Sequence, residues 1–293
     1  MKLIQSLFLL TSFAILEACS PSSEKNTALS NQVDALASQV ESEISTFKKI
    51  TILDHHEMAE EEDVNIPPAI LTIFSSPKVN ATLLKKSQLI GLDLPFKVLV
   101  YSDTVRTKVA FTSAEFIQKR HGLAPYLLND YSTAMEQALT SVPDDKIAKL
   151  DLSGLSAEYG IVKIKSEYDF TTTIQNLKDI VMSQEEAKWF ADVDFQKEAS
   201  EIDFPLLPNT LLLFGSNAQD GKSMADSPLL GLDAFCQKVL VFEDESGGVW
   251  IAFNDIIAFA ELYYSRSSEV QQTTNASLIR TFKKAITISE VME

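Results

Sequence analysis

Hydrophobic residues recur with helical periodicity in two segments of this chain. Apolar positions three or four residues apart predict an amphipathic helix over about residues 29–47. The same spacing recurs over residues 174–181 and predicts a second helix. Asp169 or Thr171, each of which precedes this segment, is a candidate N-cap residue. A short apolar run at residues 161–164 precedes this second helix and predicts a strand. No such run precedes the first helix, so we expect that strand only in the second half.

Runs rich in β-branched and aromatic residues follow each helix and predict three strands in each half. They cover residues 70–74, 97–101 and 108–112, and residues 211–214, 238–242 and 249–253. Each set is followed by a further predicted helix, over residues 113–121 and 256–266. The sequence therefore predicts an α+β protein in which sheets pack against helices.

The two halves repeat the same motifs about 140 residues apart. Leu89-Ile-Gly-Leu-Asp93 matches Leu229-Leu-Gly-Leu-Asp233, and Lys97-Val-Leu-Val matches Lys238-Val-Leu-Val. Matches in one order with small shifts indicate a duplication. We expect the chain to consist of a signal peptide at 1–18, a tether at 19–31, a first domain at 32–150 and a second domain at 155–293.

The chain begins with a secretion pattern. Lys2 precedes an apolar run at residues 3–16, which is too short to span a bilayer. Leu16-Glu17-Ala18-Cys19 resembles the lipobox of bacterial lipoproteins, apart from Glu17, where a small or apolar residue is usual. The resemblance implies cleavage before Cys19 and lipidation of its sulfur, which makes the membrane a partner. Ser20 after the cysteine favours the outer membrane, facing the periplasm. The alternative is an ordinary secretory signal.

Charge and cysteine content narrow the function classes. The net charge of −16 repels nucleic-acid phosphates, so we expect no nucleic-acid partner. Cys19 and Cys236 are the two cysteines of the sequence. With Cys19 lipidated, Cys236 has no partner within the chain, and we interpret it as a small core residue.

Several strings of the second half resemble the DUF302 family, a domain of unknown function. They include Leu211-Leu-Leu-Phe-Gly215 and Lys238-Val-Leu-Val-Phe-Glu-Asp244, and the first half matches through Leu92-Asp-Leu-Pro-Phe-Lys-Val-Leu-Val100. The resemblance implies an antiparallel sheet packed on helices, in the β-α-β(n)-α arrangement of TATA-binding proteins. Shared fold does not imply shared DNA binding.

The family pattern also supplies candidate ligand-binding residues. It contains an Asp-His pair and a turn resembling Phe-Gly-Asn-Pro-Lys. The first half retains Asp54, His55, Pro77 and Lys78 but lacks the glycine, whereas the second half retains Gly215 and lacks the histidine and the Pro-Lys pair. Neither half is intact.

Asp54-His55-His56-Glu57 is the cluster with most chemical promise. A carboxylate beside an imidazole sets its tautomer, and imidazole is a common metal ligand. Adjacent residues on a strand point to opposite faces, however, and the spacing fits no zinc motif, so we expect no metal. The simpler interpretation is a polar pair at a strand edge before a solvated acidic turn.

These observations favour a membrane-tethered periplasmic protein that binds a small molecule or serves as an accessory module, without catalysis. One alternative is an enzyme that uses Asp54 and His55 with a metal or redox cofactor. Another is a structural envelope protein. The identity of any cofactor stays open. We expect the two domains to pack as an intramolecular pseudo-dimer, with a ligand cleft between them or under the Asp54-His55 edge.

Overall fold

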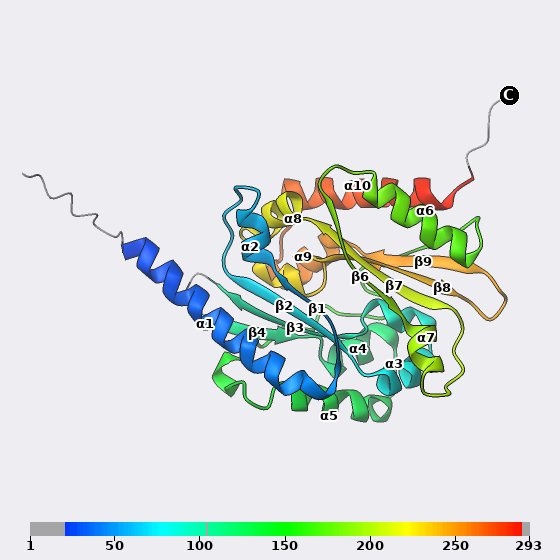
Figure 1. The fold of residues 1–293 in the computed structure, drawn as a ribbon, viewed down its shortest axis with the longest axis horizontal. Coiled ribbons are helices and arrows are strands. Elements are labelled where there is room, and N and C mark those ends of the chain that lie inside the picture. The colour runs from blue at the N-terminus through cyan, green and yellow to red at the C-terminus, as the bar shows by residue number, and fades with distance from the viewer. Residues whose placement is uncertain (1–20, 104, 289–293) are drawn as a thin grey trace, which may run out of the picture.

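The computed structural model describes residues 21–103 and 105–288. Two antiparallel sheets form its centre, one with strand order β1-β2-β3-β4 and the other with order β5-β9-β8-β7-β6. Helices pack around both sheets (Figure 1). The α+β fold class predicted from the sequence is therefore confirmed. The predicted signal peptide and Cys19 lie outside the described residues.

The first copy contains one long helix, four strands and several shorter helices. In chain order they are α1 (Pro21–Glu43), β1 (Lys48–Asp54), α2 (His55–Glu60), β2 (Ala69–Ser75), α3 (Pro77–Leu84), the 3₁₀ helix η2 (Gln88–Leu92), β3 (Phe96–Ser102), β4 (Thr107–Phe111), α4 (Ala114–His121) and α5 (Asn129–Ala138). Short 3₁₀ turns η1 (Ile44–Thr46), η3 (Pro125–Leu128) and η4 (Asp144–Lys146) connect some of them.

The second copy repeats this order with one extra strand in front. Its elements are β5 (Ile161–Lys165), α6 (Phe170–Met182), β6 (Ala187–Asp194), α7 (Phe195–Ser200), β7 (Asn209–Ser216), α8 (Asn217–Met224), η5 (Pro228–Leu232), β8 (Gln237–Glu243), β9 (Val249–Asn254), α9 (Ile256–Tyr264) and α10 (Glu269–Ile286). Strand, helix, further strands and helices follow in the expected β-α-β(n)-α order. The structure describes the first copy from α1 onward, so the residues before that helix lie outside the described range.

The strands of the two copies pair in equivalent registers. Phe74 of β2 pairs with Phe96 of β3, and Phe214 of β7 pairs with Gln237 of β8. Both outer strands, β1 and β6, carry a register shift at the same place relative to their partners. The strands around Leu71 and Leu211 therefore occupy equivalent places in their sheets.

Two strands were not predicted from the sequence. β1 and β6 lie at sheet edges, and most of their side chains are only partly buried. Edge strands with mixed polarity lack the continuous apolar run that identifies a buried strand. Each is followed directly by a six-residue helix, capped by Asp54 in one copy and by Asp194 in the other.

The stretch expected to be a polar tether differs from the prediction. The helix α1 already begins at Pro21, and a proline suits the first turn of a helix because its missing N–H would have no partner there. Leu29 and Val33 are buried, so the apolar stripe of the helix starts within the predicted tether.

The side chains of β7 alternate between two cores. Leu211 and Leu213 belong to a large core that contains residues of both copies. Leu212 and Phe214 belong to a smaller core under α6 and α10, which lie side by side in Figure 1. Alternation of this kind follows from the two-residue period of a strand. The sheet of the second copy is thus covered on both faces.

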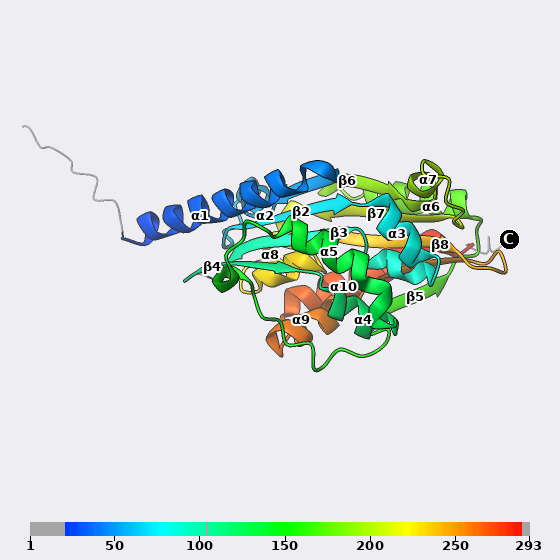
Figure 2. The ribbon, with the colours of Figure 1, turned by 90° about the horizontal axis from the view of Figure 1, so that it is seen from below.

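The two copies contact each other through matching elements. Helix α2 contacts α8, and its counterpart α7 contacts α3. Likewise, β3 contacts η5, and β8 contacts η2. On the opposite side, α4 and α9 lie together (Figure 2), with the rings of Phe116 and Phe259 6.3 Å apart.

Ion pairs between the copies follow the same pattern. Glu198 of α7 accepts hydrogen bonds from Lys48 and Ser75, at 2.8 and 2.7 Å. Glu61, which follows α2, accepts from Lys188 and Asn217, at 2.9 and 3.0 Å. Each copy therefore supplies a glutamate to the edge strand of the other.

Candidate functional site

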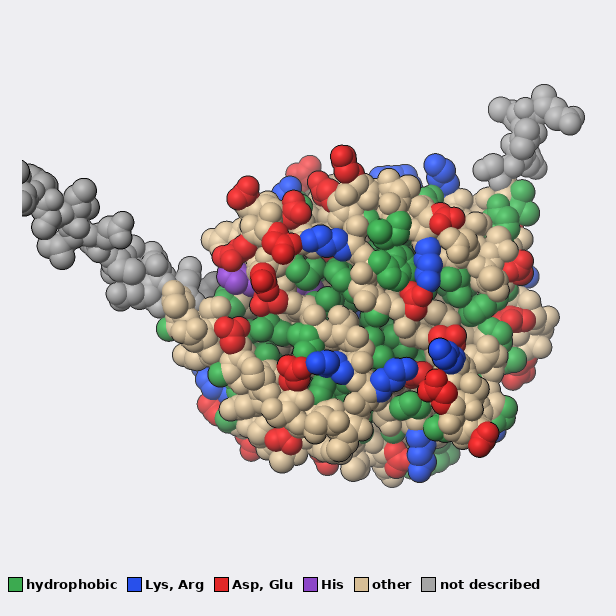
Figure 3. Space-filling model, in the orientation of Figure 1, with side chains coloured by type: hydrophobic (Ala, Val, Ile, Leu, Met, Phe, Trp, Pro, Cys, Tyr) green, Lys and Arg blue, Asp and Glu red, His purple; other side chains and the backbone are tan. Residues whose placement is uncertain are grey.

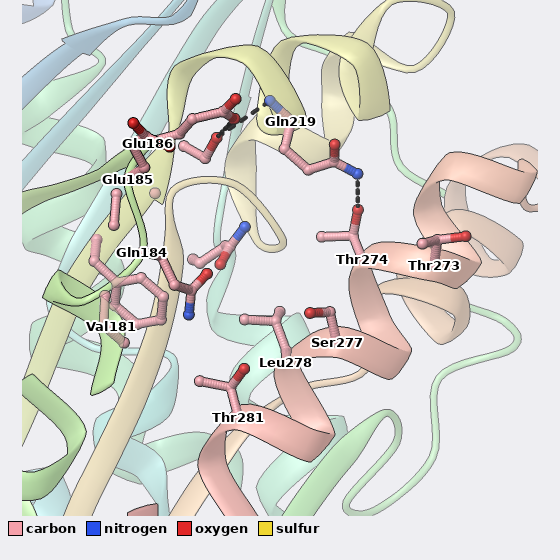
Figure 4. Close-up of a pocket in the computed structure, with 15 residues that line it drawn as sticks. Val181, Gln184, Glu185, Glu186, Gln219, Thr273, Thr274, Ser277, Leu278 and Thr281 are labelled. Carbon is pink, nitrogen blue, oxygen red and sulfur yellow. Dashed lines mark hydrogen bonds between the residues drawn. The ribbon is translucent and has the colours of Figure 1, made fainter. Parts of the chain in front are cut away.

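A pocket of about 470 Å³ opens on the outer side of the second copy, within the range usual for small-molecule sites. It lies between the C-terminal end of α6, the helix α10 and the ends of β6, β7 and β8 (Figure 4). Its lining residues are Val181, Gln184, Glu185, Glu186, Ala187, Phe214, Gly215, Ser216, Gln219, Gln237, Thr273, Thr274, Ser277, Leu278 and Thr281. We call this the Gly215 pocket.

Neutral hydrogen-bonding groups dominate the Gly215 pocket. Hydroxyls of α10 and the amide of Gln184 lie on opposite sides of the opening in Figure 4. Gln219 donates to Thr274 Oγ1 at 2.7 Å and so fixes part of the wall. The lining contains the carboxylates of Glu185 and Glu186 and no lysine, arginine or histidine. Amides and hydroxyls both donate and accept, which suits an uncharged polar ligand.

A buried carboxyl lies behind the wall of the pocket. Gln237 Nε2 donates to Asp220 Oδ1 at 2.6 Å, and the backbone N–H of Ser216 donates to Asp220 Oδ2 at 3.2 Å. Burial raises the pKa of Asp220 to about 7. The amide of Gln237 is therefore held by a group that titrates near neutral pH.

Gly215 was predicted as a site residue, and the structure gives it a specific reason to be glycine. A Cβ added there would lie 2.5 Å from Asp220 Oδ2 and 3.0 Å from the ring of Phe190. The first copy has Ser75 at the equivalent place, and Asn80 Nδ2 donates to its hydroxyl at 2.8 Å. At this place the first copy therefore has a serine–asparagine pair, and the second copy has a glycine beside an aspartate.

The equivalent space in the first copy is filled with aromatic rings. Phe96 stacks on Phe74 with ring centroids 5.2 Å apart, and on Tyr131 with centroids 4.5 Å apart. Tyr131 also donates to the carbonyl oxygen of Thr112. In the second copy, Gln237 occupies the register position of Phe96. The pocket is present where this aromatic residue is missing.

The other predicted site residues do not join Gly215, since none of them lines its pocket. Asp54 accepts the backbone N–H of Glu57 and caps α2. Pro77 is the first residue of α3, and the side chain of Lys78 is exposed. The four residues of the first copy therefore lie apart from the pocket of the second.

His55 was interpreted as part of a polar pair at a strand edge, and this was wrong. It is the first residue of α2 and is buried, because α2 packs against α8 of the other copy. A Cβ added at Gly231 would lie 3.3 Å from its ring. Burial lowers the pKa of His55 to about 4, so the imidazole is neutral at neutral pH. His55 is a contact between the copies.

The acidic turn after α2 is exposed. Figure 3 shows acidic side chains gathered near α2, where Glu60 to Asp63 face solvent. His56 Nε2 lies 3.3 Å from Glu60. Within residues 21–103 and 105–288, no group of three or more histidine, cysteine, aspartate or glutamate side chains is placed to hold a metal ion.

A second group of polar residues is buried between the copies. We call it the interface cluster: Asp93, Lys97, Arg120, His121, Asp233, Lys238, Asn254 and Tyr263. Arg120 Nη1 and His121 Nε2 contact the two oxygens of Asp93 at 2.6 and 2.7 Å. Although burial opposes it, these neighbours lower the pKa of Asp93.

Asp233, the counterpart of Asp93, is bound in a similar way. Lys97 donates to its Oδ1 and Tyr263 to its Oδ2, at 2.7 and 2.6 Å. Burial and the Asp233 carboxylate raise the pKa of Tyr263 well above its usual value, so it remains a neutral donor. Lys97 belongs to the first copy, so this ion pair crosses the boundary.

The sequence contains a signal for some residues of the interface cluster and for one residue of the Gly215 pocket. Asp93 and Lys97 recur as Asp233 and Lys238, although their neighbours are apolar. Charged residues retained inside two apolar strings indicate a buried ionic pair. Gln237 could be found by aligning the halves, since it stands where the first half has Phe96. The hydroxyls of α10 give no comparable signal, because serines and threonines on a helix are usually solvated.

The fold and the pocket define a class of protein: two tandem sheet-and-helix domains, joined through a buried polar cluster, with an open pocket on one of them. The chain belongs to the family described as "Domain of unknown function DUF302", whose model matches residues 23–142 and 162–285. Two tandem copies, as the sequence indicated, are thus confirmed.

Other similarities are partial. The crystal structure of an uncharacterized conserved DUF302 protein from Bacillus stearothermophilus is similar over 43% of this chain and 95% of that chain, with 12% identity and a TM-score of 0.36. The fluoride-specific ion channels FluC 1 of Brucella suis biovar 1 and FluC 2 of Brucella melitensis biotype 1 are each 31% identical over 74 residues. That stretch is 25% of this chain and 29% and 27% of the channels, so the chain spans less than a third of their length.

Across the described residues, no helix combines the length and apolar character needed to cross a membrane.

Proposed function

We propose that this protein is an envelope lipoprotein, anchored by a lipid on Cys19, whose second copy binds a small uncharged polar molecule in the Gly215 pocket. The signal-peptide pattern and the Leu-Glu-Ala-Cys string support the address. The size and polar lining of the pocket support the ligand class. A polyol or a sugar has the required chemistry, since its hydroxyls pair with both donors and acceptors.

One observation carries the proposal: Gln237 stands at the register position of Phe96. The same scaffold has a filled aromatic core in one copy and an open, amide-lined pocket in the other. If the exchange of phenylalanine for glutamine only weakened packing, the buried amide of Gln237 would have no hydrogen-bond partner. Instead, this amide donates to Asp220 at 2.6 Å. The pocket wall is hydrogen-bonded, which is the preorganisation that ligand binding needs.

Binding fits the pocket better than catalysis. Ser216 is the last residue of β7, and its hydroxyl donates to Glu186 Oε2 at 3.3 Å. Activation of a hydroxyl usually needs an adjacent general base held by a third group. The lining offers no histidine, cysteine or lysine for such a relay. We therefore propose a binding module rather than an enzyme.

We also propose that the two copies act as one intramolecular pseudo-dimer. The matched contacts of α2 with α8 and of α7 with α3 support this arrangement. Small-angle scattering of the mature protein is expected to give one compact particle. An extended, two-lobed particle would contradict the pseudo-dimer.

The ligand proposal is tested by a thermal-shift screen of the mature protein with a panel of polyols and mono- and disaccharides, because a ligand of the folded state raises Tm by mass action. A hit is then measured by calorimetry against Ser277→Leu, which places an apolar side chain in the pocket. We expect at least a tenfold loss of affinity. Ala276→Leu is the control, since Ala276 is the neighbouring exposed residue of α10 and lies outside the lining.

Two results would contradict the proposal. One is a panel in which no uncharged polyol or sugar raises Tm while charged compounds do. The other is a hit whose affinity falls equally in both leucine variants. The address is tested separately by labelling cells with radioactive palmitate, where Cys19→Ala is expected to abolish incorporation.

A further inference from the structure

A cleft of about 820 Å³ lies at the boundary between the two copies, and its volume is within the range of small-molecule sites. The first copy lines it with the ends of β3 and β4, and the second copy with η5 and the end of α9. Residues 145–151, which join the copies, form a further wall. The N–H of Ala148 donates to the carbonyl oxygen of Val109 in β4 at 2.8 Å, so this wall is fixed to the sheet. We call this the boundary cleft.

A smaller cleft of about 390 Å³ occupies the equivalent place across the boundary. There η2 of the first copy lies opposite the end of β8 of the second. Tyr101 and Asp103 line the boundary cleft. Phe242 and Asp244, at the equivalent positions, line the smaller one. The same place thus has a phenol on one side of the molecule and a phenyl ring on the other.

The hydroxyl of Tyr101 has no hydrogen-bond partner within residues 21–103 and 105–288. The residue as a whole is only 6% exposed. Its oxygen is not among the fully enclosed polar atoms without a partner, so it opens into the cleft that the residue lines. Burial raises the pKa of Tyr101 to about 12, which keeps the hydroxyl a neutral donor. A nearly buried donor of this kind is stabilised by an acceptor that enters the cleft.

Tyr264, the last residue of α9, brings a second phenol to the boundary cleft. Its oxygen accepts the backbone N–H of Leu229 at 2.9 Å, so its own proton is left to donate elsewhere. Among the described residues, nothing accepts that proton. Burial raises the pKa of Tyr264 above its usual value, and Tyr101 and Asp103 add to the effect as neighbours. Two neutral donors therefore share one region of the cleft.

The charged side chains of the boundary cleft do not take up these donors. Asp103 Oδ2 is paired with Lys108 at 2.7 Å. Asp103 Oδ1 accepts the backbone N–H groups of Val105 and Arg106, at 3.2 and 2.9 Å. The lining contains three lysine or arginine side chains and four aspartates, so its formal charge does not favour an anion.

We propose that the boundary cleft binds an uncharged carbonyl compound with an apolar body, whose carbonyl oxygen accepts hydrogen bonds from the hydroxyls of Tyr101 and Tyr264. A carbonyl oxygen has two lone pairs and no proton, so it suits a pair of donors. The half-buried side chains of Ile147, Leu150 and Leu262 offer apolar surface for the rest of the ligand. This site needs both copies, and it is separate from the Gly215 pocket.

The experiment compares three naphthalene compounds in equilibrium dialysis with the mature protein: 2-acetylnaphthalene, 2-ethylnaphthalene and 2-naphthoate. Tyr101→Phe removes one hydroxyl and introduces the residue of Phe242, without loss of a hydrogen bond within the described residues. We expect the affinity for the ketone to fall about three- to tenfold, the range of one neutral hydrogen bond, and the affinity for the hydrocarbon to stay the same. Tyr126→Phe is the control, since Tyr126 is 72% exposed and lies outside the lining, and it should change neither affinity.

Four results would overturn the site. They are the absence of saturable ketone binding, as for a cleft that holds only water, an unchanged ketone affinity in Tyr101→Phe, an equal loss for ketone and hydrocarbon, and tighter binding of the carboxylate than of the ketone. Ser277→Leu, in the Gly215 pocket, should leave the ketone affinity unchanged. A loss in that variant would assign the ketone to the Gly215 pocket and reject the boundary cleft.

Discussion

The two copies carry very different side chains at one equivalent strand position, Phe96 in the first copy and Gln237 in the second. In the first copy the position belongs to a stack of three aromatic rings. In the second it belongs to the wall of a polar pocket. One scaffold therefore carries a filled core in the first copy and an open cavity in the second. Variants that place the residue of one copy into the other can separate these two roles.

The largest effect is expected from Phe96→Gln. The change removes a fully buried ring that contacts Phe74 and Tyr131, and it buries an amide without the aspartate that Gln237 has. The free energy of unfolding should fall by about 3–5 kcal/mol, as for other buried aromatic truncations. Urea unfolding at pH 7 measures this loss. A loss below about 1 kcal/mol would show that the ring stack contributes little to the first copy.

Asp220→Asn places the residue of Asn80 in the second copy, and its effect depends on pH. Burial raises the pKa of Asp220 from 3.8 to about 7, so the folded protein keeps a proton that the unfolded chain loses. The stabilising contribution of the carboxyl is fully present below pH 3.8 and is lost as the pH rises to 7. Asparagine has no such dependence.

Wild type should therefore lose stability relative to Asp220→Asn between pH 4.5 and 8, by about 2–4 kcal/mol. Urea unfolding of both proteins at the two pH values gives the difference. A difference that is constant with pH would contradict the raised pKa.

His55→Phe places the residue of Phe195 in the first copy and reverses the sign of the pH effect. Burial lowers the pKa of His55 from 6.5 to about 4, so the unfolded chain is protonated first as the pH falls. The contribution to stability is fully present above pH 6.5 and is lost toward pH 4. The variant should resist acid better than wild type, by about 1–3 kcal/mol at pH 4.5, when each is compared with its own value at pH 7.5. Thermal unfolding that shows parallel acid sensitivity would argue against a neutral, buried imidazole.

The smallest effect is expected from Lys78→Ala, which introduces the residue of Ala218. The side chain of Lys78 is exposed. Stability should change by less than about 0.5 kcal/mol, and affinity for any ligand of the Gly215 pocket should stay the same. Calorimetric titration and urea unfolding test both points. A marked loss of affinity would give this lysine a role that its position does not suggest.

The sequence predicted the fold well where hydrophobic periodicity was strong. The strands around Leu71 and Leu99, and their counterparts around Leu211 and Leu240, were found because they are buried and continuous. The edge strands β1 and β6 were missed because nearly all of their side chains are exposed or only partly buried, so neither strand has a continuous apolar run. The short helices that carry His55 and Lys78 have too few residues to show a helical period.

The candidate site was predicted only in part. Gly215 was found through a family pattern, and the structure places it in a pocket wall. Asp54 and His55 resembled a functional pair in the sequence because a carboxylate adjoins an imidazole. In the structure, Asp54 caps a helix and His55 is buried in the contact between the copies. The burial of a single histidine depends on distant elements, here α8 and η5, so its surroundings cannot be derived from its neighbours in sequence.

The pairing of His121 with Asp93 and of Tyr263 with Asp233 has a consequence for how such a protein evolves. Two identical subunits must place the same side chain on both sides of their axis, so every substitution acts twice. Joining them in one polypeptide removes that obligation and also makes their association independent of concentration. One side can then acquire an imidazole and the other a phenol, and the molecule gains asymmetric chemistry without risking dissociation when it is scarce.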